Sequence, residues 1–390
     1  MRRVTDEKRF LPYGQQLIDE DDIAAVVAAL RSPLITQGPR IAEFEAALVA
    51  YVGGGHASVV ANGTVALQLA YAALGLQPGD EIITTPNTFA ATANAARALG
   101  ADVRFCDVEA DTGNLDAAQI EALITKRTRG IVPVHFGGLP ADLAAIRAIA
   151  DRHSLWVVED GAHALGATYR GETTGTCTLS DATTFSFHPV KHITTGEGGA
   201  IMVRDPALKR RIDRLRHHGV EREQLTIPSP GPWYHEIAEL GWNARLTDLQ
   251  CALGLSQLRK QPAWLVRRRE LAAAYRARLA ARLPQLVAVQ ATRADRVSAF
   301  HLFPALIDFV AAGRSRADVM NALRERGIGT QVHYIPVDSQ PYYRSLYGDP
   351  APHPGMRSFY DRELSLPMYA GLDDSDVDRV VETLAAVLGA

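Results

Sequence analysis

The segment Ser186-Phe-His-Pro-Val-Lys191-His-Ile-Thr-Thr-Gly-Glu-Gly-Gly199 is the part of the chain around which the rest is organised. An apolar run at 182–187 leads into it, and a second apolar run at 200–203 follows its glycine-rich turn. These runs predict two buried strands joined by a loop that carries Lys191. Because burial disfavours the charged form of a lysine, we expect Lys191 to be a nucleophilic amine rather than a solubilising charge.

Groups that can bind an anion surround this lysine. Ser186, Thr194 and Thr195 offer hydroxyl groups, and the glycine-rich turn offers backbone amides. A nucleophilic lysine beside an anion site is what a Schiff base with pyridoxal 5′-phosphate (PLP) requires. The alternative interpretation, a lysine on a surface loop, is disfavoured by the apolar runs on both sides.

The composition of the chain excludes several other classes of protein. Its 390 residues suit about two domains by length alone. A net charge of −3 gives no general electrostatic reason to bind nucleic acid or an anionic membrane. Arginine-rich stretches occur within helical patterns, so we interpret them as solvated helix faces.

Cysteine usage and the chain start indicate where the protein works. Cys106, Cys177 and Cys251 are widely spaced and odd in number, which predicts neither a disulfide framework nor a zinc site. The first eight residues lack the apolar stretch of a signal peptide, and no run reaches the roughly 18 apolar residues of a membrane span. We therefore expect a cytoplasmic protein.

Strand and helix patterns alternate between residues 57 and 159. The predicted strands lie at 57–60, 81–84, 101–106, 130–134 and 155–159, and the predicted helices at 65–74, 89–99, 116–123 and 141–153. Such alternation, with short connections, predicts an α/β fold with a mostly parallel sheet covered by helices. Ligands of such sheets bind at the carboxyl ends of the strands.

The pattern differs before and after this region. Residues 1–40 read as an arm with one helix at 23–30, and a second helix follows at 41–51. Two helices are predicted at 242–258 and 262–283, and we place a domain change between them. The result is an arm and large domain at 1–260 and a small C-terminal domain at 261–390. In the small domain we expect a strand at 300–309, a helix at 315–326 capped by Ser315, and a terminal helix at 374–388.

Several polar residues follow the predicted strands directly. Asn62-Gly63-Thr64 lies between a strand and a helix, where free amides can bind phosphate, although a plain helix cap is an equal alternative. Asp160 ends a strongly apolar strand, and a carboxylate there can pair with a pyridine nitrogen. His163 can contact the ring oxygen or Asp160, or it can be a core histidine. Phe89 can stack on a cofactor ring or pack in the core.

Other chemistries lack their usual signals. His188 and His192 are four residues apart, but the intervening Pro189 is not compatible with a helical metal site, so we expect no metal. The chain contains no GxGxxG, Walker, HExxH or GxSxG motif.

Together these motifs resemble the DegT/DnrJ/EryC1/StrS sugar aminotransferases. The resemblance rests on Asn62-Gly-Thr-Val-Ala-Leu67, Glu159-Asp-Gly-Ala-His163, Ser186-Phe-His-Pro-Val-Lys191, Gly196-Glu-Gly-Gly199 and Gly241-Trp-Asn243 through Asp248-Leu-Gln250, in the family's order. It runs from Pro12-Tyr-Gly14 to the terminal helix. It implies PLP-dependent transferase fold type I, with a seven-stranded, mostly parallel sheet and a smaller α+β domain.

The resemblance also implies a reaction. PLP, alternating with its pyridoxamine form, would move an amino group from glutamate to C4 of a nucleotide-linked 4-keto-6-deoxy sugar. The subgroup resembled most acts on UDP-linked N-acetylhexosamine derivatives, as in pseudaminic acid pathways. The alternatives are a 3-aminotransferase acting on a 3-keto nucleotide sugar and a non-catalytic regulatory protein of the same fold.

Residue roles follow from the resemblance position by position. Lys191 is expected to hold PLP as an internal aldimine and to shuttle protons, and Asp160 to pair with the pyridinium. The resemblance further implies contacts of His163 on the ring oxygen side, of Phe89 on the ring, of Gly63, Thr64 and Ser186 on the phosphate, of Asn243 on the phosphate of the cofactor in the partner subunit of a homodimer, and of Tyr13, Thr36, Gln37, His333 and Tyr334 on the substrate side. One departure from the family pattern is Gly161, which replaces an alanine; we expect the loss of that methyl group to be tolerated.

Overall fold

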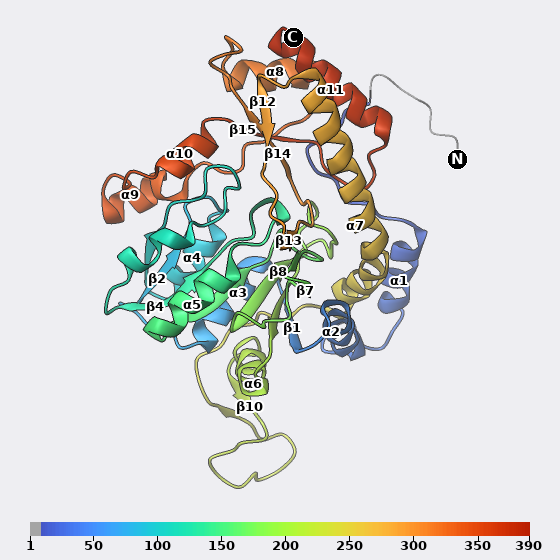
Figure 1. Ribbon diagram of the computed structural model, residues 1–390. Helices are drawn as coiled ribbons and strands as arrows, with labels where there is room; N and C mark the ends of the chain where they lie inside the picture. The colour runs from blue at the N-terminus through green and yellow to red at the C-terminus, as the bar shows by residue number, and fades with distance from the viewer. Residues whose placement is uncertain (1–8) are drawn as a thin grey trace.

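Seven strands form the central sheet, in the order β1-β9-β8-β5-β4-β2-β3 (Figure 1). Their bounds are β1 His56–Val60, β2 Glu81–Thr84, β3 Asp102–Phe105, β4 Thr128–Val132, β5 Trp156–Asp160, β8 Ala182–Ser186 and β9 Gly199–Val203. Only β9 among them runs antiparallel to its neighbours, β1 and β8; the other adjacent pairs are parallel. This computed structural model, which describes residues 9–390, confirms the predicted fold class. The first eight residues of the expected N-terminal arm lie outside the described residues.

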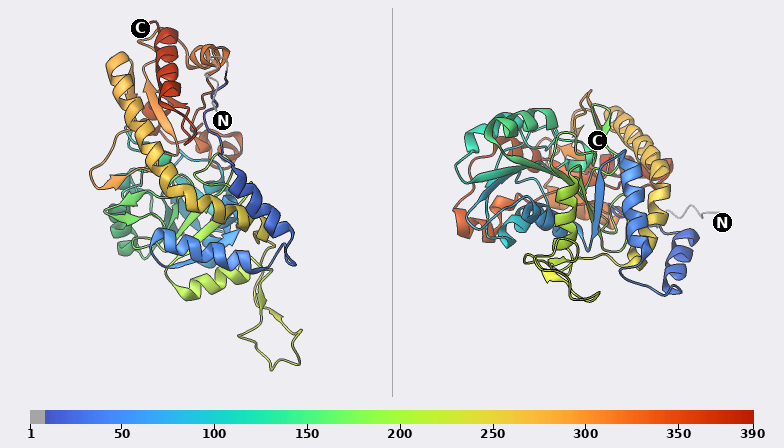
Figure 2. Two further views of the ribbon diagram at one scale, coloured as in Figure 1. Left: turned by 90° about the vertical axis from the view of Figure 1, so that its right-hand side faces the viewer. Right: turned by 90° about the horizontal axis from the view of Figure 1, so that it is seen from below.

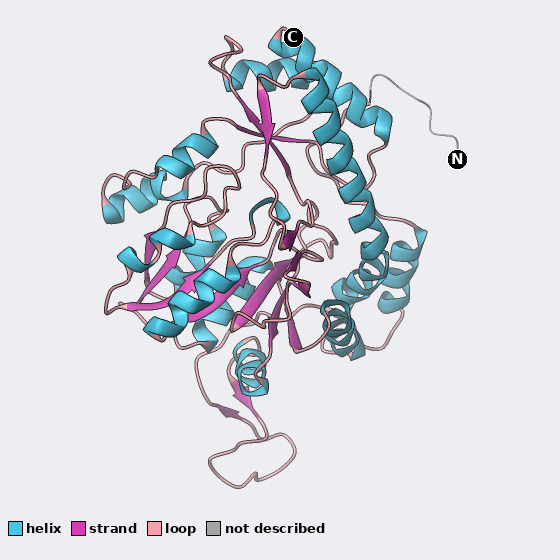
Figure 3. Ribbon diagram, viewed as in Figure 1, coloured by secondary structure: helices cyan, strands magenta, loops and turns pink. Residues whose placement is uncertain are grey.

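Helices cover both faces of this sheet (Figure 3). One apolar cluster joins one face to α3 (Gly63–Ala73), α4 (Ala91–Ala98) and α6 (Pro206–Leu215). Clusters on the other face include α2 (Pro39–Val52) and α5 (Leu143–His153). Neighbouring strand residues such as Val157 and Val158 belong to opposite clusters, as the alternation of side chains along a strand requires.

The C-terminal part has a sheet and a core of its own. Its strands are β12 (Val287–Val289), β14 (Phe303–Ile307) and β15 (Glu363–Leu366), and its helices include α8 (Arg316–Glu325) and α11 (Asp374–Leu388). Ser315 caps α8, as predicted: its hydroxyl accepts from the backbone amide of Asp318. Other elements are α1 Glu20–Leu30, β6 Thr168–Tyr169, β7 Glu172–Thr173, β10 Val220–Glu221, β11 Glu236–Ile237, β13 Arg296–Val297, α9 Pro341–Tyr347 and α10 Pro354–Tyr360. Within residues 9–390, no helix combines the length and apolar character that crossing a bilayer requires.

A single helix, α7 (Asp248–Arg282), replaces the two helices predicted around residue 260. That prediction was wrong because Pro262, which we took as a break, lies inside the helix. A proline there costs roughly 3 kcal/mol, but both halves are held by packing. The first half buries Leu258 in the core of the large sheet, and the second buries Tyr275 in the C-terminal core. The proposed domain boundary therefore falls within a helix, and the division at residue 260 stays a prediction.

The helix predicted at 116–123 is also wrong. The segment forms two 3₁₀ turns, at 117–119 and 121–123. The Asp116 carboxylate accepts a hydrogen bond from the backbone amide of Ala118, which favours the tighter turn. A segment this short gains too few α-helical hydrogen bonds to offset nucleation.

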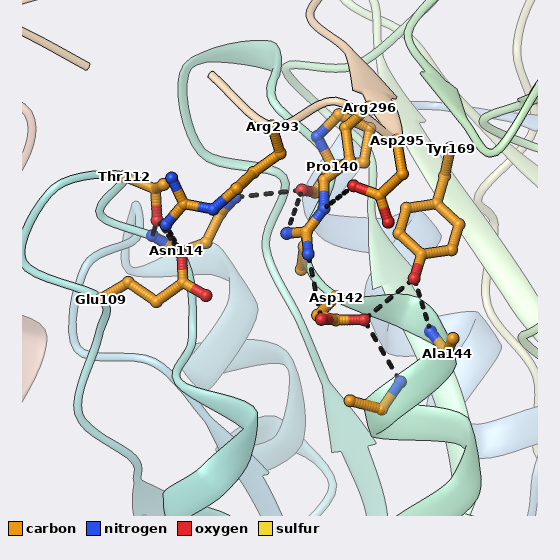
Figure 4. Close-up of polar contacts among 12 residues, drawn as sticks. Glu109, Thr112, Asn114, Pro140, Asp142, Ala144, Tyr169, Arg293, Asp295 and Arg296 are labelled. Carbon is orange, nitrogen blue, oxygen red and sulfur yellow. Dashed lines mark hydrogen bonds and ion pairs between the residues drawn. The ribbon is translucent and has the colours of Figure 1, made fainter. Parts of the chain in front are cut away.

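Polar contacts fasten the start of the C-terminal part to the large sheet (Figure 4). The Arg296 guanidinium lies 3.0 Å from a carboxylate oxygen of Asp142 and donates to the backbone oxygen of Pro140 at 3.3 Å. Asp142 in turn accepts from the Tyr169 hydroxyl at 2.9 Å. Arg293 pairs with Glu109 at 2.9 Å. Two long-range pairs therefore hold residues 293–296 against the loops at the edge of the sheet.

The β10–β11 ribbon and the loop beyond it project away from the body of the protein (Figures 1 and 2). Several large apolar side chains on this projection are exposed: Ile227 (52%), Trp233 (70%), Ile237 (61%) and Leu240 (82%). Apolar residues gathered on such a projection are typical of an interface.

Asp248 offers a test of what orders the start of α2. Its buried carboxylate accepts from the backbone amides of Gly38 at 2.7 Å and Arg40 at 3.0 Å. We expect Asp248→Ala to lower the free energy of unfolding by about 1–3 kcal/mol, because two amides lose their acceptor. Urea unfolding at fixed protein and cofactor concentration measures this. The exposed first-turn acid of α1, Asp21, is the control, and Asp21→Ala should cost under about 1 kcal/mol. Equal effects of the two changes would contradict the capping role.

Candidate functional site

Lys191 lies in the loop between β8 and β9, whose ends are paired through Ser186 and Gly199. The Lys191 amine, Nζ, is 3.4 Å from Nε2 of His301. Burial lowers the pKa of this amine to about 8, and the negative charge of Asp160 opposes the shift. A larger fraction of Lys191 than of an ordinary exposed lysine is therefore the neutral, nucleophilic amine near neutral pH.

Asp160 is the last residue of β5 and is buried. One carboxylate oxygen accepts from the Thr92 hydroxyl at 2.7 Å, and the other accepts from the backbone amide of Ala162 at 3.1 Å. Because the Thr92 hydroxyl donates its proton to Asp160, the Thr88 hydroxyl is the donor in the 2.7 Å hydrogen bond between the two threonines. Two hydroxyl groups in series thus fix the position of the Asp160 carboxylate.

His163 faces the same region from the turn after β5. Its Nε2 is 3.1 Å from the Tyr334 hydroxyl, and its ring centroid is 4.4 Å from that of His301. Burial lowers the pKa of His163 well below its usual range, and the charge of Lys191 adds to the effect, so the imidazole is neutral. Its Nδ1 is buried without a hydrogen-bond partner. An unsatisfied buried nitrogen of this kind indicates a place for a ligand atom.

The start of α3 and the end of β8 form the candidate anion seat. Asn62 caps α3 by accepting from the backbone amide of Val65 at 2.9 Å, and Gly63 and Thr64 are the first two helical residues. A Cβ atom on Gly63 would lie 2.9 Å from Cβ of Ser186, so only glycine allows this close approach. The structure therefore brings Gly63, Thr64 and Ser186 to one place, as the sequence predicted for neighbours of an anion.

Phe89 does not begin a helix as predicted, because α4 starts at Ala91. Its ring is 64% exposed and lies 6.3 Å, centroid to centroid, from the ring of Tyr334. An exposed phenyl ring beside this polar cluster favours a stacking surface over the core-packing alternative.

The expected substrate residues divide into two groups. Tyr13, His333 and Tyr334 gather beside His163, with the rings of Tyr13 and His333 5.5 Å apart. Thr36 instead forms an isolated bridge with Thr247, and Gln37 lines a cavity of about 360 Å³. Arg216, His217 and Arg245 line that cavity as well, whereas Lys191 does not.

Asn243 belongs with this second group. It is exposed and pairs with His217, which lines the same cavity. Gln37, and His217 which pairs with Asn243, thus line a cavity that Lys191 of the same chain does not line.

Sequence reasoning missed two residues that contact the predicted ones. His301 approaches Lys191 from the C-terminal part, and Thr92 donates to Asp160 from α4. Neither lies in a local motif that signals its role. Gly161 also has a clearer reason than we expected, because a Cβ atom there would lie 2.9 Å from the backbone oxygen of Thr184. Glycine at position 161 avoids this close contact, so it is favoured there and not only tolerated.

Comparisons with known proteins agree over almost the entire chain. The sequence profile of the DegT/DnrJ/EryC1/StrS aminotransferase family matches residues 16–385. The spore coat polysaccharide biosynthesis protein SpsC of Bacillus subtilis is 39% identical over 388 residues, which cover 99% of each chain.

Solved structures show the same architecture. Helicobacter pylori PseC, an aminotransferase involved in the biosynthesis of pseudoaminic acid, superposes with a TM-score of 0.91 at 32% identity, covering 98% of this chain and 100% of that one. The PMP form of the putative sugar aminotransferase Spr1654 from Streptococcus pneumoniae gives a TM-score of 0.90 at 29% identity, with 97% and 99% covered. A family profile that matches 370 residues, together with folds this similar, places the chain in the DegT/DnrJ/EryC1/StrS aminotransferase family, as a PLP-dependent sugar aminotransferase.

Proposed function

We propose that this enzyme transfers an amino group from glutamate to C4 of a nucleotide-linked 4-keto-6-deoxy sugar, with a UDP-linked N-acetylhexosamine derivative as the substrate class. The observation that carries the proposal is the full-length similarity to PseC, which is named for pseudoaminic acid biosynthesis. A 3-aminotransferase acting on a 3-keto sugar remains the second candidate, because the same lysine chemistry serves either carbon. The free, buried state of all three cysteines supports a reducing, cytoplasmic setting.

The residues around Lys191 fit PLP. The Asp160 carboxylate, which accepts from the Thr92 hydroxyl, suits a partner of the protonated ring nitrogen, and the exposed Phe89 ring offers a stacking face. The start of α3 beside Ser186 suits the phosphate group. The unpartnered Nδ1 of His163 suits a contact with the ring oxygen.

The protein's own groups then have distinct tasks. The bound cofactor supplies an aldehyde that accepts the amino group and a ring that withdraws electrons. Lys191 Nζ takes the proton from the carbon that carries the amino group and returns it to the acceptor carbon. Asp160 would hold a proton at the ring nitrogen, and the hydrogen bonds of Thr88 and Thr92 fix the Asp160 carboxylate in place. His301 orients the Lys191 amine from the C-terminal side.

The decisive experiment for the proposal uses spectra and product analysis. We expect the purified protein with PLP to show a visible-edge absorption band that moves to shorter wavelength with glutamate. The loaded protein should then aminate a UDP-linked 4-keto-6-deoxy-N-acetylhexosamine, with the amino group located at C4 by NMR of the product. Amination only of a 3-keto nucleotide sugar would contradict C4 transfer. Absence of the band would reject the lysine assignment and favour a non-catalytic relative.

Substitutions along the hydroxyl series should have graded effects. We expect Asp160→Asn to lower kcat by about 10²–10³-fold, since it removes the charge that holds the ring proton. Thr92→Val removes one charge-assisted hydrogen bond and should cost roughly tenfold. Thr88→Val, one step farther away, is the matched control and should cost less than Thr92→Val. Steady-state kinetics at saturating PLP measure the series, and a Thr92→Val enzyme with the wild-type kcat would contradict the role of Thr92.

We further propose a homodimer with shared sites, in which Asn243, Thr36 and Gln37 serve the partner's Lys191. The support is that Gln37, and His217 which pairs with Asn243, line a cavity that Lys191 does not line, together with the exposed apolar projection formed by the β10–β11 ribbon and its loop.

Mixing two inactive variants tests the shared site. We expect Lys191→Ala and Asn243→Ala to be inactive or strongly impaired alone. After subunit exchange, mixed dimers contain one intact site, so activity should return to about a quarter of the wild-type level in an equal mixture. If Asn243 acts within its own chain, no mixed dimer has an intact site and the mixture stays inactive.

A further inference from the structure

A carboxyl group, a hydroxyl group and an imidazole form one buried hydrogen-bonded series behind the substrate side of the site. Glu363 and Ser365 are two residues apart on β15, so both side chains point to the same face, and both are fully buried. Ser365 Oγ is 2.6 Å from Oε1 of Glu363 and 2.8 Å from Nδ1 of His333. The other carboxyl oxygen, Oε2, accepts from the backbone amide of His333 at 2.8 Å. The carboxyl group therefore contacts His333 twice, once directly and once through Ser365.

The Glu363 carboxyl group has no ion-pair partner among the described residues. Along residues 9–390, no lysine or arginine forms an ion pair with it; Arg316, whose charge acts on it, donates instead to the backbone oxygens of Tyr360 and Glu363. Burial raises the pKa of Glu363 to about 8. Near neutral pH the group is therefore largely protonated.

When Glu363 is ionised the Ser365 hydroxyl donates to Oε1, and when Glu363 is protonated the direction of this bond reverses. Because Oε2 already accepts from an amide, the carboxyl proton lies on Oε1 and is donated to Ser365 Oγ. The Ser365 hydroxyl donates in turn to Nδ1 of His333, which leaves the imidazole proton on Nε2.

The His333 Nε2 atom is available to a substrate. This atom forms no hydrogen bond with the described residues. It is also not fully enclosed by them, so it still reaches solvent. The ring packs against Tyr13 and Tyr334 and feels the charge of Lys191. Burial, with a further contribution from Lys191, lowers the pKa of His333 to about 3. A second proton on this ring is thus strongly disfavoured, and His333 can give up its Nε2 proton only if another reaches Nδ1.

We propose that Glu363, Ser365 and His333 form a proton relay that delivers a proton from His333 Nε2 to an oxygen atom of the bound keto sugar. The inference rests on the proposed function, since a ketone oxygen must gain protons to leave as water during amination. The Nε2–H bond breaks as an O–H bond forms on the substrate. The Ser365 proton moves to Nδ1, and the Glu363 proton moves to Ser365. His333 stays neutral throughout, and Glu363 is left as a carboxylate that accepts from Ser365 and from the His333 amide.

The relay predicts a tautomer change that needs no substrate. In the PLP-loaded enzyme with ¹⁵N-labelled histidine, we expect His333 to carry its proton on Nε2 at pH 6–7. Above the pKa of Glu363, Ser365 donates to the carboxylate and the proton should move to Nδ1. The His333 signal among the 12 histidines is assigned by its loss in His333→Asn. One tautomer held from pH 6 to pH 10 would overturn the relay.

The Glu363→Gln variant keeps the arrangement of the hydrogen bonds but cannot transfer a proton from residue 363. The amide oxygen replaces Oε2 and the amide NH₂ donates to Ser365, so His333 should keep its proton on Nε2 at every pH. Lys191, Tyr13, Tyr334 and Arg316, the other titratable or charged groups facing this series, are unchanged in the variant. A titration caused by any of them would persist in Glu363→Gln, and its persistence would reject Glu363 as the source.

A kinetic experiment tests delivery itself. In single-turnover amination at pH 7, we expect Glu363→Gln to be at least about tenfold slower than wild type, because its amide cannot supply a proton. Glu325→Gln, an exposed change at the end of α8, is the matched control and should match wild type. A wild-type rate in Glu363→Gln would overturn the proposal that this series delivers a proton to the substrate. If wild type aminates no nucleotide sugar, the proposed function fails separately, and the NMR experiment still tests the relay.

Discussion

The burial of one amine between β8 and β9 is the constraint on which the rest of the structure depends. A lysine exposed to water would be charged at neutral pH and could not act as a nucleophile. The fold disfavours that charge by desolvation, which lowers the pKa of Lys191 to about 8, and the carboxylate of Asp160 moderates the effect. His163, His301 and His333 can stand near the amine because burial keeps each of them neutral. A charged imidazole at any of these positions would repel Lys191 and compete for the same proton.

The sheet and the C-terminal part supply different halves of the site. Strand ends of the large sheet position Asp160, Ser186 and the start of α3, which suit the cofactor. The C-terminal part supplies His301 through the residues before β14, and His333 and Tyr334 through the segment before α9. The continuous helix α7 and the Arg293–Arg296 contacts (Figure 4) hold these two parts together. The proline inside α7 is accepted because each half of the helix is anchored in a different core.

Local patterns in the sequence were sufficient for the groups at strand ends. Apolar runs marked the strands, and the residues directly after them, such as Asp160 and Ser186, had to meet at one edge of the sheet. Contacts between distant segments gave no such signal. His301 meets Lys191 across 110 positions, and no spacing rule connects them. The role of Thr92 was not predicted because a threonine within a helix carries no sequence signal of a functional contact. The placement of Gln37 in a cavity that Lys191 does not line could not be foreseen either, since one chain's pattern does not distinguish its own site from a partner's.

The position of Glu363 shows how a strand of the C-terminal sheet can carry chemistry without touching a ligand. A buried, uncompensated carboxyl group is costly, and an apolar residue at this position would pack more cheaply in the core. The cost is reduced by protonation and by two hydrogen bonds, one with the backbone amide of His333 and one with Ser365, which in turn contacts Nδ1 of His333. A merely structural role would need only one of them, because the backbone amide already fixes the His333 segment. The second connection, through Ser365, reaches the ring nitrogen and thereby controls the proton on the opposite nitrogen. That coupling is the reason to regard β15 as part of the reactive machinery rather than as core alone.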